Sequence, residues 1–146
     1  LLEHTSIPTP LAEVLNRQGL KALKNNDKTT LLNCLRGLSH AKAAKIRQQL
    51  LAKVLASELA TDQHILLVIT GRCWLDLQDD ALRSTFLEQL ACASEDQHLF
   101  QGIVADLVAI PAVRPHMLQS FRNTDRSPTL ATAIGHLFGQ HQTASH

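Results

Sequence analysis

The chain has 146 residues, a formal net charge of +1, 18% charged residues and 45% hydrophobic residues. This length and balance predict one globular domain and exclude a disordered chain or a miniprotein that depends on disulfides. Aromatic residues make up 3% and tyrosine is absent, so the core must consist mostly of Leu, Ala, Val and Ile. Because strands draw on aromatic and β-branched residues, this composition favours helices.

Neither a membrane span nor a secretion signal is expected. The longest apolar run, residues 65–69, is far shorter than the roughly 18 residues that a spanning helix needs, and prolines interrupt the N-terminal region before a signal core can form. The three cysteines form no Cys-x-x-Cys pair. We therefore expect Cys34, Cys73 and Cys92 to be buried thiols of an intracellular, cytoplasmic protein.

The chain is expected to begin with an extended lead over residues 1–9. Pro10 suits the first position of a helix and starts the first one. Asp27 precedes an apolar run and is predicted to cap a short second helix, which Gly37 ends.

Ser39 is predicted to cap the longest helix, over residues 40–60. Its apolar side chains spread over more than half of the circumference, so we expect it to be the central element. Residues 64–70 are ambiguous, because a short apolar run suits a buried strand as well as a helix. The sequence offers no second strand-like run to pair with it, and Thr61-Asp62 is a good helix start, so we predict a helix.

Four more helices are predicted in the second half of the chain. The first covers residues 79–93, and a capping-box sequence at 94–97 starts the next. Two prolines end that helix and begin a shorter one, and a Ser-Pro pair opens the last. The two prolines are Pro111 and Pro115, and the Ser-Pro pair is Ser127-Pro128. Residues 140–146 are expected to form a disordered tail.

A sequence pattern recurs at an interval typical of helical hairpins. Asp27, Asp62 and Asp96 each lie just ahead of an apolar run, and they are 35 and 34 residues apart. Tetratricopeptide repeats have a similar interval, but their Trp, Gly and Tyr positions are missing here, and similar caps can also recur by chance. The predicted fold is all-α: one domain over residues 10–139, a multi-helix bundle or short array of hairpins, with seven or eight helices and antiparallel neighbours.

Charge is distributed unevenly along the chain. Residues 1–60 contain nine Lys and Arg and four Asp and Glu. Residues 61–146 contain five Lys and Arg and nine Asp and Glu. Within the predicted central helix, Lys42, Lys45, Gln49 and Lys53 share one side. This stripe is the candidate partner-binding site. It can meet an acidic or amphipathic protein segment or nucleic-acid phosphates, or it can be the solvated side of an amphipathic helix.

Residues 31–40, followed by a helix with Lys and Arg, have the element order of a helix-turn-helix motif. However, the following helix is apolar over most of its surface. The isoelectric point of about 8.0 is also lower than that of dedicated nucleic-acid binders.

Signatures of catalysis and of metal binding are missing from the sequence. It has no nucleophile elbow, no phosphate-binding loop and no dinucleotide-binding glycine motif, and its eight histidines lack metal-ligand spacing. Asp76, Asp79 and Asp80 precede a helix, where carboxylates stabilise the N-terminus, a role that we prefer to an acid–base pair. Trp74 is expected in the core or at a seam between helices.

The sequence therefore predicts a non-catalytic protein–protein interaction domain, such as an adaptor, a chaperone or a complex subunit, without cofactor or metal. The partner segment would bind in a groove between helices or on the basic helix face. A nucleic-acid-binding domain that uses the basic N-terminal half is the alternative, and a helical enzyme is a third hypothesis.

Overall fold

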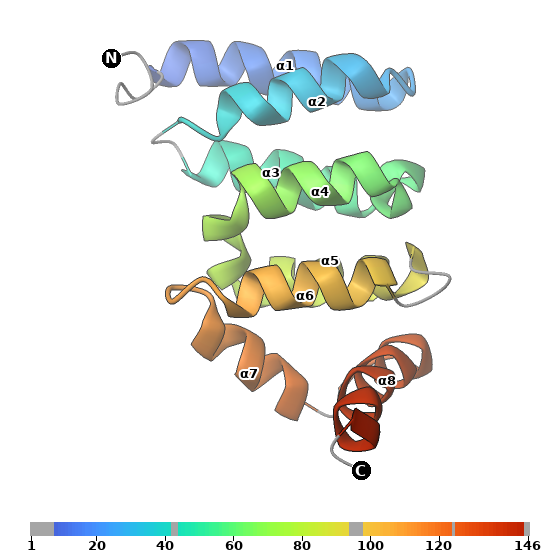
Figure 1. The fold of residues 1–146 in the computed structure, drawn as a ribbon. Helices are drawn as coiled ribbons and strands as arrows, with labels where there is room; N and C mark the ends of the chain where they lie inside the picture. The colour runs from blue at the N-terminus through green and yellow to red at the C-terminus, as the bar shows by residue number, and fades with distance from the viewer. Residues whose placement is uncertain (1–7, 42–43, 94–97, 124, 145–146) are drawn as a thin grey trace. The chain divides into compact units, whose positions relative to one another are not determined.

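In a computed structural model, the chain folds into helices joined by short loops (Figure 1). The structure describes residues 8–41, 44–93, 98–123 and 125–144. It is 83% helical, with eight α-helices and no strand among these residues, which confirms the all-α prediction. Its contacts divide the chain into two compact units, unit 1 over residues 1–76 and unit 2 over residues 77–146. That residues 10–139 fold as a single domain stays a prediction.

Unit 1 contains two helical hairpins. Its elements are α1 (Thr9–Lys24), α2 (Lys28–Leu38), α3 (Ala44–Leu55), the 3₁₀ helix η2 (Glu58–Thr61), α4 (Gln63–Arg72) and the start of the 3₁₀ helix η3 (Trp74–Gln78). Helix α1 packs on α2, and the second hairpin stacks on the first through contacts of α1 with α3 and of α2 with α4. At Gly19 an added Cβ would lie 2.8 Å from Leu50 Cδ2, so a glycine allows this close approach of α1 to α3.

The predicted aspartate caps are present in unit 1. Asp27 accepts hydrogen bonds from the backbone N–H and the hydroxyl of Thr30, at 3.2 and 2.6 Å. Asp62 accepts from the N–H groups of His64 and Ile65 at the start of α4. Residues 64–70 are therefore helical, as predicted, and the capping-box sequence that contains Asp96 lies outside the described residues.

The recurring interval is that of the helix pairs. The second helices α2 and α4 begin at Lys28 and Gln63, 35 residues apart, and α6 is described from His98 onward. The starts of α2 and α4 directly follow the capping aspartates, so the sequence pattern marks the second helix of each pair in unit 1.

The prediction of one long helix over residues 40–60 is wrong. Ser39 lies at the end of α2, and its hydroxyl donates a hydrogen bond to the carbonyl of Arg36 at 2.6 Å. Helix α2 also continues past Gly37. An added Cβ there would lie 3.1 Å from Leu15 Cδ1, so this glycine serves the packing of α1 on α2 and does not end the helix.

Unit 2 contains α5 (Asp80–Ala93), α6 (His98–Val108), α7 (Arg114–Arg122) and α8 (Pro128–Ala144). Helix α5 packs on α6 and α8, and α6 packs on α7. Ser127 caps α8, because its hydroxyl oxygen accepts from the N–H of Leu130 at 3.1 Å. The Ser127 hydroxyl and N–H both donate to the carboxylate of Glu88 on α5, which fixes the start of α8 on that helix.

No helix in the described parts of the chain is long and apolar enough to cross a membrane.

Candidate partner-binding site

The basic stripe predicted from the sequence lies on α3. Lys45, Gln49 and Lys53 are exposed and follow each other at four-residue intervals, so they share one side of the helix. Lys42 lies outside the described residues. The stripe therefore presents two cations and one amide within the described part of the chain.

A buried ion pair occupies the opposite side of α3. The side chains of Arg47 and Asp76 are 7% and 2% exposed, and both Nε and Nη2 of Arg47 donate to the carboxylate, the latter at 2.8 Å. The other terminal nitrogen of Arg47 donates to the carbonyl of Ala41 at 2.7 Å. The hydrogen bond to Asp76 raises the pKa of Arg47 above its ordinary value.

Asp76 therefore does not have the role expected from the sequence. It lies inside unit 1 and neutralises a buried guanidinium, whereas Asp79 does stabilise a helix start by accepting from the N–H of Leu82 at 3.0 Å. Arg47 lies in the helix that would enter a DNA groove in a helix-turn-helix motif. The positive charge of Arg47 is already paired with Asp76, which argues against DNA binding by this segment.

A groove of about 300 Å³ lies on unit 1 between α2 and α4, and we call it the Arg72 groove. It is lined by Arg36, His64, Leu67, Val68, Gly71 and Arg72. Leu67 is 43% exposed although it belongs to the most apolar run of the chain. No acidic residue is among the lining side chains. The groove thus combines an exposed apolar surface with cationic edges.

A second hollow, of about 280 Å³, shares Arg72 with the Arg72 groove and continues along the chain into η3. Its lining includes His40 and Leu75, and the Arg47–Asp76 pair forms part of its wall. Leu75 is 52% exposed, more than any other large hydrophobic side chain in the described residues. Leu67, Gly71 and Leu75 follow each other at four-residue spacing, and each lines one of the two hollows.

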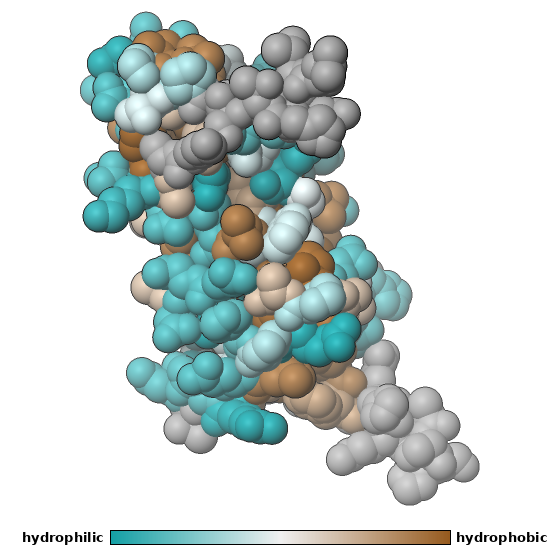
Figure 2. Space-filling model, turned by 90° about the vertical axis from the view of Figure 1, so that its left-hand side faces the viewer, coloured by the Kyte–Doolittle hydropathy of each residue, from teal (hydrophilic) through white to brown (hydrophobic). Residues whose placement is uncertain are grey.

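On the face of the molecule drawn in Figure 2, hydrophilic side chains predominate and hydrophobic ones form small separate patches. Scattered apolar residues of this kind are ordinary on a protein surface. Leu67 and Leu75 differ from such residues because they lie in hollows beside an arginine.

A polar cluster fixes one end of the Arg72 groove. The Lys28 ammonium at the start of α2 lies 3.1 Å from a carboxylate oxygen of Asp62 and 3.1 Å from Nδ1 of His64. Partial burial alone would raise the pKa of Asp62, but the hydrogen bonds from Lys28 and from the N–H of Ile65 hold it below its ordinary value. The cluster joins the starts of α2 and α4, which form the two walls of the groove.

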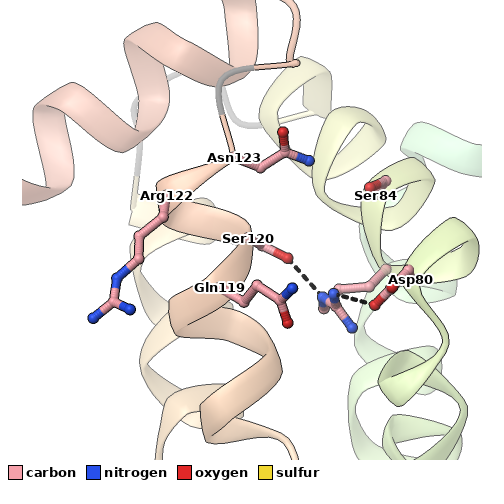
Figure 3. A pocket seen from close by; sticks show the side chains of 7 residues that line it. Asp80, Ser84, Gln119, Ser120, Arg122 and Asn123 are labelled. Carbon is pink, nitrogen blue, oxygen red and sulfur yellow. Dashed lines mark hydrogen bonds and ion pairs between the residues drawn. The ribbon is translucent and has the colours of Figure 1, made fainter.

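Unit 2 has a polar hollow of about 350 Å³ between α5 and α7 (Figure 3). The buried Arg83 next to it donates to Ser120 at 2.6 Å, to Asp80 at 2.7 Å and to two backbone carbonyls. Arg122 points away from the other labelled side chains. The Arg83 guanidinium in this hollow is thus already satisfied by the protein, and the cluster is explained by the hydrogen bond that joins α5 to α7.

The cysteines differ in their surroundings. Cys34 and Cys73 are buried as expected, but Cys92 is exposed, because it lies on the outer side of α5. Burial raises the pKa of Cys73 to about 12. Trp74 is half-buried at the start of η3. The described residues contain no group of three or more His, Cys, Asp or Glu side chains that could hold a metal ion.

A family model described as "Protein of unknown function (DUF3549)" matches residues 1–138. The chain belongs to this family. Comparisons with curated proteins and with solved structures found no match. The description of the DUF3549 family names no activity, so the function of this chain has to be inferred from its surfaces.

Sequence reasoning missed the Arg72 groove. Arg36 and Arg72 are far apart in the sequence, so nothing local indicates that they lie on one groove. Residues 65–69 are all apolar, so periodicity could not indicate which of these five side chains faces outward. Gly71 was not a usable signal, since Gly102 and Gly135 also lie in helices with no atom near an added Cβ.

Proposed function

We propose that the chain is a non-catalytic protein–protein interaction domain, an intracellular adaptor or complex subunit, that receives a segment of its partner in the Arg72 groove. The observation that carries this proposal is the exposure of Leu67 in a hollow between two helices. Grooves of this kind bind amphipathic segments, because the apolar side chains of the segment cover the exposed apolar surface.

Gly71 supports the same reading. A Cβ added at this position meets no atom within 4 Å, so the packing of unit 1 does not require a glycine there. Gly71 shares this property with Gly102 and Gly135, so only its place in the lining of the groove bears on the proposal. Its presence leaves the floor of the groove open, and a partner backbone can approach α4 closely at that point.

Nucleic-acid binding is the second candidate, because unit 1 carries ten Lys and Arg against six Asp and Glu. Single-stranded nucleic acids also need stacking surfaces, and Trp74 is the one aromatic residue in the sequence of unit 1. The pairing of Arg47 with Asp76 further reduces the charge available on α3. We therefore rank this candidate below protein binding.

The test is a pull-down from nuclease-treated lysate with three versions of the chain as bait. Gly71→Trp fills the groove, and Gly102→Trp is the matched control, since Gly102 is also an exposed helical glycine with no atom near an added Cβ. We expect a protein that binds the wild type and Gly102→Trp and is lost with Gly71→Trp. Retention of every bound protein by Gly71→Trp would refute the role of the groove.

A double variant of the α3 stripe separates the two candidates. If Lys45→Glu with Lys53→Glu abolishes steeply salt-dependent binding to duplex DNA or RNA, and no protein is bound through the groove, nucleic-acid binding replaces the proposal. If it abolishes protein binding instead, the partner binds on the basic helix face.

A further inference from the structure

We infer that the occupant of the Arg72 groove is an acidic amphipathic helix of another protein. This inference rests on the proposed function and goes beyond it by naming the chemistry of the partner. Two independent properties of unit 1 support it, the charge around the groove and the position of its exposed leucines.

The charge around the groove is positive. Arg36 on α2 and Arg72 on α4 are exposed cations in the lining. The two acidic residues at its ends are already engaged, since Asp62 is bound by Lys28 and Asp76 is buried against Arg47. Guanidinium groups bind carboxylates in a two-pronged geometry, so glutamate or aspartate side chains of a partner fit the edges of this groove.

Two large apolar side chains at the groove and the adjoining hollow are exposed. Leu67 on α4 lines the Arg72 groove, and Leu75 on η3 lines the adjoining hollow, beyond the bend at Cys73 where α4 has ended. A partner helix in the groove would cover Leu67 with leucine-type residues on one face, spaced at i and i+3 or i+4. Its acidic residues would then face the arginines. A phosphate backbone offers no such apolar side chains, which favours a protein partner.

The experiment selects binders from a phage-displayed library of random 16-residue helical peptides, with the full-length chain as the target. Wild-type chain is compared with a double variant, Arg36→Glu with Arg72→Glu. The matched control is Lys45→Glu with Lys53→Glu, which makes the same change in net charge on a different surface of unit 1. Far-UV circular dichroism of each variant checks that the helices are retained.

We expect peptides selected on the wild type to have a net negative charge and leucine-type residues at helical spacing. The same peptides should bind the arginine double variant at least about 10-fold more weakly, because close charge pairs in an interface are commonly coupled by more than 1.4 kcal/mol. They should bind the lysine double variant with less than about a 3-fold change. Binding to Gly71→Trp should be lost.

Three outcomes would overturn the inference. They are a selection without enriched peptides, enriched peptides without net negative charge, and acidic peptides that respond equally to the lysine and arginine variants. None of these outcomes affects the proposed function by itself. A protein captured in the pull-down and lost with Gly71→Trp would still establish the groove as an interaction site, with a partner of different chemistry.

Discussion

Removing the carboxylate of the buried Asp76 should destabilise unit 1 strongly. In Asp76→Ala, Arg47 loses the acceptor for two of its nitrogens, and Gln48 loses the partner of its amide at 3.3 Å. The Arg47 side chain is 7% exposed, so its charge would stay buried without a counter-ion. Breaking one side of a buried ion pair typically costs about 3–5 kcal/mol. The adjoining hollow of about 280 Å³ gives water some access, so we expect the lower end, about 3 kcal/mol.

The assay is urea unfolding followed by the fluorescence of Trp74, the single tryptophan, which lies two residues from Asp76. Two variants serve as controls. Lys28→Met breaks the partly exposed pair with Asp62 in the same unit and should cost about 1 kcal/mol or less. The double variant Arg47→Met with Asp76→Leu removes both charges and should recover much of the lost stability.

A loss for Asp76→Ala no larger than that for Lys28→Met would refute this reasoning. It would mean that the Arg47 guanidinium finds water or another acceptor when the carboxylate is absent. A double variant as unstable as the single one would instead show that the shape of the pair matters more than its charge.

Two further predictions concern titratable side chains. A thiol reagent at pH 8 should modify one cysteine of the native chain, Cys92, and three after denaturation, because burial raises the pKa of Cys34 and brings that of Cys73 to about 12. Rapid modification of two or more thiols in the native chain would contradict this. Asp62→Ala should lower the free energy of unfolding at pH 7 by about 1 kcal/mol through loss of the α4 cap, whereas Asp62→Asn should lower it less. The folded pKa of Asp62 is below its model-peptide value of 3.8, so this stabilisation is present above that pH and is lost as the pH falls through the folded pKa. A difference between wild type and Asp62→Ala that stays constant down to pH 2 would contradict the role of the ionised carboxylate.

Local sequence signals predicted much of the helical structure. Asp27 and Asp62 mark helix starts because a carboxylate satisfies N–H groups only two or three residues away. The apolar run at 65–69 was assigned correctly because no other segment could pair with it as a strand. Gly37 misled the prediction, since its role depends on Leu15 of another helix and not on its own neighbours.

The surfaces and buried pairs depended on the tertiary structure. The Arg47–Asp76 pair joins residues 29 positions apart, and the contacts of Lys28 with Asp62 and His64 join residues 34 and 36 positions apart. The Lys28 contacts form because one helical hairpin stacks on the other, and this stacking also decides which leucines of an apolar run stay exposed. The Arg47–Asp76 pair forms because the chain that follows α4 lies against α3. The sequence by itself determined that the chain is helical and where most helices begin, because capping and periodicity act within a few residues. The Arg72 groove was decided by the stacking of α2 on α4, and the buried ion pair by the contact of η3 with α3. Both bring distant residues together and leave no local trace in the sequence.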